Sequence, residues 1–152
     1  MKLSKPDVML NSFMLLSMDS TTFDETWKPV WGEQSSIRNH YRQLKLSLRD
    51  AGSSGILVTV YFRVFDDGVG FRYEFPQQPN LNHFIIADEY SNFAMTGDHN
   101  AFWIPGDYDT NEYSYYNTSL SGISSAQRSS SQEIYAKSPI GSNAVQTPLM
   151  LK

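Results

Sequence analysis

The densest group of side chains that could bind a ligand lies between Trp31 and Tyr41. An aromatic ring at Trp31 and a carboxylate at Glu33 are followed by the guanidinium of Arg38, the amide of Asn39 and the ring of His40. Such a set suits a polyhydroxyl ligand, because aromatic faces stack on sugar rings while polar groups bond the hydroxyls. It would serve equally well as a hydrogen-bonded brace against a neighbouring domain, and both interpretations stay open.

Trp103 is a second candidate for a carbohydrate-facing or interdomain position. Like Trp27 and Trp31, it lies in an irregular segment flanked by Pro, Gly, Asp, Asn or His. A Trp in such a loop can stack on a pyranose ring, or it can cap the open end of a sandwich core.

No catalytic residue is assigned from the sequence. Glycoside hydrolysis needs two carboxylates across a cleft, and although carboxylates are plentiful, the pattern places no two of them together. Motifs of the G-x-S-x-G type and phosphate-cradling glycine loops are absent. The absence of cysteine excludes disulfides, thiolate catalysis and zinc-thiolate sites.

No metal ligand or cofactor is assigned either. The segment from Asp107 to Asn111 has the alternating oxygen ligands of a calcium loop, but Glu112 and Thr118 stand where an EF-hand needs Gly and Glu. We interpret it as a solvated acidic loop. The three histidines, His40, His83 and His99, do not pair at ligand spacing.

Charge and hydropathy exclude two classes of partner. The net charge of −4 and the lack of a basic cluster argue against nucleic acid. No stretch approaches the ~20 apolar residues that span a bilayer. Lys2 and Lys5 precede an apolar stretch, but Pro6 and Asp7 interrupt it and no small-x-small site follows, so we expect a first strand and no signal peptide.

The elements that would position these residues are short strands separated by turns. The alternation in Ile56–Phe65, with apolar residues on both faces, predicts a central strand, and the turn at 66–68 leads into a return strand from Val69 to Phe75. We predict further strands at Val8–Met18, from Ile37 onward, and at His83–Ala87, Phe93–Met95, Phe102–Ile104, Ile134–Lys137 and Ala144–Leu151.

The remaining segments are predicted to be irregular. We expect a turn at Asp19–Glu25, an ordered loop at Thr26–Glu33 and a mobile serine-rich surface loop at Ser119–Ser131. Asp107–Asn117 could be a helical turn or a loop. Together the pattern predicts one all-β domain over residues 1–152, a β-sandwich.

Several segments, in order along the chain, resemble glycoside hydrolase family 97. The likeness runs from about Trp27 onward, and its ordered segments make it specific. They are the run from Trp27 to Glu33, then Ile37–Tyr41 and Leu44, the stretch from Phe62 to Pro76, Asp88-Glu89 with Phe93, Ala101–Pro105 and Thr147–Leu149.

The resemblance implies an N-terminal β-supersandwich related to galactose mutarotase, a central (β/α)₈ barrel and a small C-terminal β domain. Members are inverting α-glucosidases or retaining α-galactosidases, typically calcium-dependent and periplasmic. Their catalytic groups and most calcium ligands lie in the barrel, so none is carried over to this chain. We therefore expect calcium only in the parent enzyme, with oligosaccharide as its substrate and the barrel as this domain's partner.

The sequence stops before the barrel and before the family's sandwich glutamate that binds calcium. We therefore expect an incomplete sandwich, inactive alone, that shapes or braces one wall of an active site built elsewhere. A free-standing carbohydrate-binding or interaction module and the remnant of a truncated gene are the alternatives. Missing strands would leave open sheet edges, so we also expect a homo-oligomer.

Overall fold

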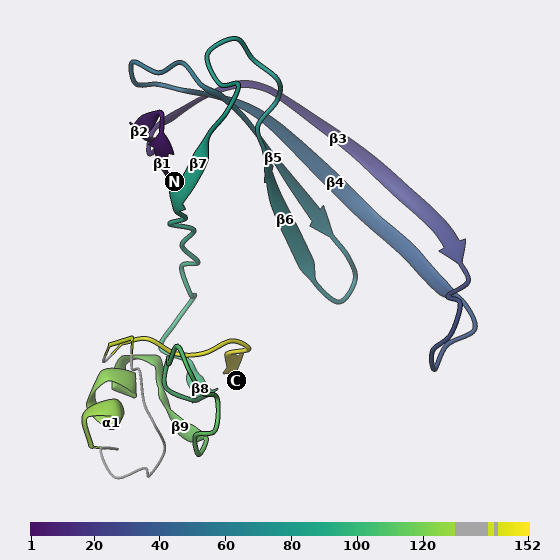
Figure 1. The fold of residues 1–152 in the computed structure, drawn as a ribbon. Helices are drawn as coiled ribbons and strands as arrows, with labels where there is room; N and C mark the ends of the chain where they lie inside the picture. Colours follow the sequence, from purple (N-terminus) through teal and green to yellow (C-terminus); the bar gives the residue numbers. More distant parts are fainter. Residues whose placement is uncertain (130–139, 142) are drawn as a thin grey trace. The chain divides into compact units, whose positions relative to one another are not determined.

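A computed structural model of the chain describes residues 1–129, 140–141 and 143–152. The described part consists mainly of antiparallel strands with one short helix, which confirms the predicted all-β class. It divides into two compact units, Met1–Ser91 and Asn92–Lys152, and each is described by itself (Figure 1). A single domain over residues 1–152 stays a prediction.

The larger sheet of the first unit has four antiparallel strands in the order β3-β4-β5-β6. The first two are long and run side by side, whereas the last two form a shorter hairpin (Figure 1). The strands are β3 (Phe13–Trp27), β4 (Ile37–Asp50), β5 (Leu57–Val64) and β6 (Val69–Glu74).

The β5–β6 hairpin follows directly from its sequence. The Phe65 N–H donates to the Gly68 carbonyl at 2.8 Å and closes the turn predicted at 66–68. The register then sets Phe62 opposite Phe71 and Val60 opposite Tyr73. Because β5 pairs with strands on both sides, its predicted central position is confirmed.

A small sheet in the order β2-β1-β7 covers part of one face of the large sheet, so that the first unit is sandwich-like. Its strands are β1 (Lys2–Lys5), β2 (Asp7–Met9) and β7 (Ile85–Asp88). The residues buried between the sheets are Leu3, Leu10, Ile56, Val58, Val60 and Leu81.

A buried amide fastens the loop after β6 to the start of β5. The Gln78 Oε1 atom accepts from the Leu57 N–H at 2.8 Å, and its Nε2 atom donates to the Leu57 carbonyl at 2.9 Å. Both backbone groups of Leu57 are thereby satisfied away from water.

The second unit is built on the sheet β10-β8-β9, followed by a 3₁₀ turn and a short helix. Its core is formed by Ala101, Trp103 and Ile123. The elements are β8 (Asn100–Trp103), β9 (Tyr116–Ser119), η1 (Leu120–Gly122), α1 (Ile123–Ser129) and β10 (Met150–Leu151).

Two predictions about the N-terminal half are wrong. Residues 10–12 interrupt the expected strand Val8–Met18, which is split between β2 and β3. The expected turn at Asp19–Glu25 is strand, because an edge strand exposed on both faces carries polar residues without alternation.

Three predictions about the second half also need correction. Phe93–Met95 is not a strand, and the predicted loop Ser119–Ser131 contains η1 and α1 instead. The predicted strand Ala144–Leu151 is reduced to β10 and an isolated bridge between Pro105 and Val145. The expected strand Ile134–Lys137 lies outside the described residues. No helix among the described residues has the length and hydropathy of a membrane span.

Candidate functional site

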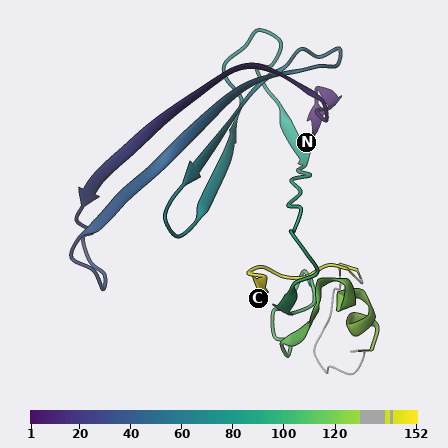
Figure 2. The same ribbon diagram turned by 180° about the vertical axis from the view of Figure 1, so that it is seen from behind.

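The predicted group from Trp31 to His40 lies on a β-ribbon, here called the hairpin arm and defined as residues 23–41. The strand β5 pairs with β4 only between Arg42 and Arg49, so the end of β4 pairs with β3 alone. Seen from behind, the two strands extend past the β5–β6 hairpin (Figure 2). The arm therefore carries its terminal loop, residues 28–36, away from the core of the first unit.

Aromatic rings fix the base of the arm. Tyr41 is buried and stacks on Phe23, its cross-strand partner, with ring centroids 5.1 Å apart. Phe65 packs on the same ring at 5.3 Å, and the Arg63 guanidinium lies over it at 4.4 Å. Such ring contacts add stability beyond the area that they bury, so the arm starts from a fixed direction.

An exposed ion pair braces the arm above this base. The Arg38 guanidinium donates from Nε and Nη2 to the two Asp24 carboxylate oxygens, at 2.8 and 2.6 Å. This bidentate bond holds the pKa of Asp24 below its usual value and raises that of Arg38. Asp24 and Arg38 are thus paired with each other across the ribbon.

The ribbon divides the predicted polar residues between its two faces. Arg38 and His40 share one face with Asp24, whereas Asn39 lies on the other face, opposite Glu25. Sequence proximity alone suggested one cluster, but the twofold alternation of a strand separates neighbouring side chains. The arrangement resembles a braced ribbon more than a convergent sugar site.

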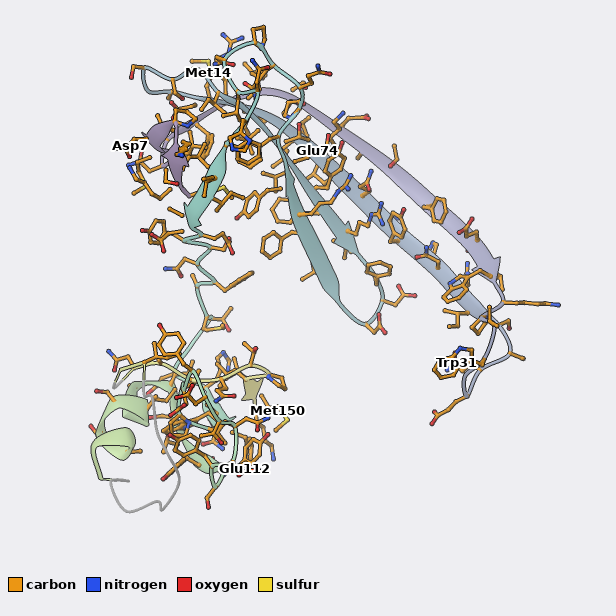
Figure 3. The ribbon with its side chains drawn as sticks, viewed as in Figure 1. Asp7, Met14, Trp31, Glu74, Glu112 and Met150 are labelled. Atoms are coloured by element: carbon orange, nitrogen blue, oxygen red, sulfur yellow. The ribbon has the colours of Figure 1, made fainter. Side chains whose placement is uncertain are left out.

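Two large apolar side chains are exposed at the tip of the arm. Trp31 is 87% exposed and Val30 is 98% exposed, and Figure 3 shows Trp31 in the terminal loop. Gly32 follows with a φ of +143°, a conformation that favours glycine. Glu33 is also exposed. The sequence-based prediction missed Val30, although an apolar residue between Pro29 and Trp31 in a predicted loop was a usable signal.

Trp103 has the opposite environment. It is 0% exposed, stacks on Tyr116 at 4.8 Å and donates from Nε1 to the Thr118 hydroxyl at 3.0 Å. Of the two interpretations that the sequence left open, the core position describes it, because the ring is fully buried and lies in strand β8.

The acidic loop after Gly106 is organised by one of its own carboxylates. The Asp107 Oδ1 atom accepts from the backbone N–H groups of Asp109 and Thr110, and its Oδ2 atom accepts from the Tyr113 hydroxyl at 2.7 Å. Among the residues that the structure describes, no cluster of three or more His, Cys, Asp or Glu side chains has metal-binding geometry.

Comparison with known proteins decides the family. The family described as Glycosyl-hydrolase 97 N-terminal matches residues 1–152. This chain belongs to it. The glycoside hydrolase family 97 resemblance of the sequence motifs is therefore confirmed.

Solved structures of a family 97 enzyme from Pseudoalteromonas sp. strain K8 are similar to this chain. They include a variant in complex with panose and a complex with acarbose. Each is 32% identical, has a TM-score of 0.65 and is matched over 71% of this chain. The chain spans 17% of the length of that enzyme.

Within a family 97 N-terminal domain, the arm could support a contact more readily than a reaction. Its tip offers one exposed aromatic ring, Trp31, with Glu33 as the one carboxylate of loop 28–36. Glycoside hydrolysis requires a pair of carboxylates, about 5–9.5 Å apart. The tip alone therefore cannot supply the acid and its partner.

Proposed function

We propose that this chain is a non-catalytic domain of an α-glycosidase that hydrolyses α-glucosidic or α-galactosidic bonds. In this proposal the hairpin arm braces one wall of an active site that a (β/α)₈ barrel elsewhere in the enzyme provides. The observation that carries the proposal is the exposure of Trp31 and Val30 at the end of a braced ribbon.

Large apolar side chains gain free energy when a partner removes them from water. Trp is enriched among the residues that dominate protein interfaces, where it is fully desolvated in a pocket of the partner. The ring stack at Tyr41 and the Asp24–Arg38 pair restrict the arm before any contact forms. A preordered arm loses less conformational entropy on docking than a free loop would.

The same exposure supports a second candidate, a carbohydrate-binding module. Trp31 with the neighbouring Glu33 could stack on a sugar and bond its hydroxyls. Saturable quenching of Trp fluorescence by maltooligosaccharides would favour this function. The separation of Asn39 from Arg38 and His40 weakens it, because those groups do not converge on one ligand.

From the family resemblance we also propose that the parent enzyme binds calcium and is periplasmic. If calcium binds outside this chain, chelation should lower the activity of the complete enzyme and leave the folding of this chain unchanged.

We further propose that the isolated chain self-associates through the outer edges of its large sheet. In the described strands, β3 and β6 each pair on one side only. The β6 edge also exposes Val69, Phe71 and Tyr73. Such edges template pairing with another chain, so size-exclusion chromatography should show a dimer or larger species.

A chimera tests the main proposal. Residues 1–152 replace the matching segment of the Pseudoalteromonas enzyme, and hydrolysis of aryl α-glycosides is measured for the chimera and the isolated chain. We expect an active chimera, an inactive isolated chain, and reduced chimera activity after Trp31→Ala. Turnover by the isolated chain, or full activity of the Trp31→Ala chimera, would contradict the proposal. Glu25→Gln, a change at the stem of the arm, is the matched control.

A further inference from the structure

A shallow hollow lies on the large sheet, on the face opposite the buried core. Gly70 stands directly across from Arg63 in the β5–β6 register, and its missing side chain leaves the space open. The hollow has a volume of about 210 Å³. Its lining residues are Tyr61, Arg63, Phe65, Gly70, Phe71 and Arg72.

Two guanidinium groups border this hollow, and each is oriented by an aromatic ring. Arg72 lies over the Tyr61 ring at 4.5 Å, and Arg63 lies over the Tyr41 ring at 4.4 Å. A guanidinium over a ring is attracted to the negative face of that ring, which restricts its motion. Both cations are therefore partly ordered before a ligand arrives.

The positive charge at the hollow is only partly balanced. Arg72 pairs with Glu74 at 3.2 Å through one nitrogen, whereas Arg63 donates from Nε to the neutral amide oxygen of Gln43 at 2.9 Å. Lys45 lies 5.8 Å from the centre of the Tyr61 ring, but its cross-strand partner on β3 is Asp19, so the unpaired positive charge at the hollow is that of Arg63. A planar carboxylate matches the fork of a guanidinium and would complement this excess.

We propose that the Gly70 hollow is a docking site for an acidic side chain of a protein partner. Exposed ion pairs are individually weak, so a single free carboxylate would bind poorly. A carboxylate on a connected polypeptide surface acts at high effective concentration, and Arg and Tyr are common at such interfaces. The identity of the partner as the remainder of the glycosidase rests on the proposed function, whereas the site itself does not.

The test is an NMR titration of the full 152-residue chain. The probe is a blocked tetrapeptide with two central glutamates, compared with its glutamine counterpart and with glucuronate. Because a short peptide lacks the connected surface of a protein partner, we expect weak but saturable shifts of the Gly70 amide and of the Arg63 and Arg72 Nε–H groups at high concentrations of the glutamate peptide. The apparent Kd should rise roughly three- to ten-fold for Arg63→Gln or Arg72→Gln, and it should rise with added salt.

Two further variants keep the outcome decisive. Gly70→Leu fills the hollow without changing charge, and because a Cβ there meets open space, the strand should persist while binding is lost. Arg42→Gln removes an exposed cation from the opposite face and should leave binding unchanged. Equal binding of the glutamine peptide, unchanged affinity of Gly70→Leu, or tighter binding of glucuronate would overturn the proposal. An active chimera with a failed titration would refute this inference alone.

Discussion

Trp31 and Trp103 occupy opposite environments in the two units of this chain. Trp31 ends a projecting ribbon and is almost fully exposed, whereas Trp103 is the largest fully buried side chain in the described part. Both lie in segments rich in Gly, Pro and polar residues. The contrast teaches that residue type and local composition identify an aromatic as important, but only tertiary packing decides between core and contact surface.

The largest predicted effect is a loss of stability when the buried Trp103 is replaced. Trp103→Ala should destabilise the second unit by about 3–5 kcal/mol, because it leaves a cavity against Tyr116 and removes the bond to Thr118. Urea unfolding followed by near-UV circular dichroism measures the loss. Trp103→Phe, which keeps a ring, should cost less. Equal stability of the alanine variant and the native chain would refute the core assignment.

Gln78→Ala tests whether a buried polar side chain also contributes to the stability of the fold. The substitution leaves the Leu57 N–H and carbonyl without their partners in a buried place, which should cost about 1–3 kcal/mol. Asn80→Ala is the matched control, since its exposed amide donates a single bond to the Ser54 carbonyl. A smaller loss for Gln78→Ala than for Asn80→Ala would contradict the argument.

The third prediction concerns the hairpin arm and tests whether the Asp24–Arg38 pair orders it. The pKa of Asp24 is lowered in the folded chain by its bond to Arg38, so this contribution is present above the unfolded pKa. It should disappear as the pH falls through the folded value. Hydrogen exchange of residues 37–41 should therefore differ between the native chain and Asp24→Asn at neutral pH but not in acid.

Salt should reduce the same difference, because both partners are exposed. Glu33→Gln makes the same charge change at the tip and should leave the exchange of residues 37–41 unaltered. An acid-insensitive difference for Asp24→Asn would show that the ion pair does not order the arm.

The smallest predicted effect on stability belongs to Trp31. Trp31→Ala should change the free energy of unfolding by no more than about 0.5 kcal/mol, because the ring has few contacts to lose. The same variant should lose much of the acrylamide-quenchable fluorescence. A destabilisation comparable to that of Trp103→Ala would erase the distinction between the two regions.

Much of the strand pattern was accessible from the sequence wherever one face of a strand is buried. The alternation of Val58, Val60 and Phe62 and the turn ending at Gly68 predicted the β5–β6 hairpin correctly. The polar half of β3 was mistaken for a turn because it is exposed on both faces. The helix α1 was missed because its serine-rich sequence lacks an apolar stripe, with Ile123 as its buried anchor.

The candidate site was predicted only in part. Motif resemblance identified the family, and the segment around Trp31 was correctly expected to be a loop. Arg38 and Asn39 lie on different faces because they are neighbours in a strand. Their closeness in the sequence suggested a single cluster and did not reveal this separation. The hollow at Gly70 depends on register between β5 and β6, and no single segment of sequence encodes it.

Hydrogen exchange of loop 28–36 in the chimera, compared with the isolated chain, tests the central claim most directly. If the arm docks on the rest of the glycosidase, the amides around Trp31 should exchange fast in the isolated chain and become protected in the chimera. Equal exchange in both, with an active chimera, would contradict the proposed role of the arm.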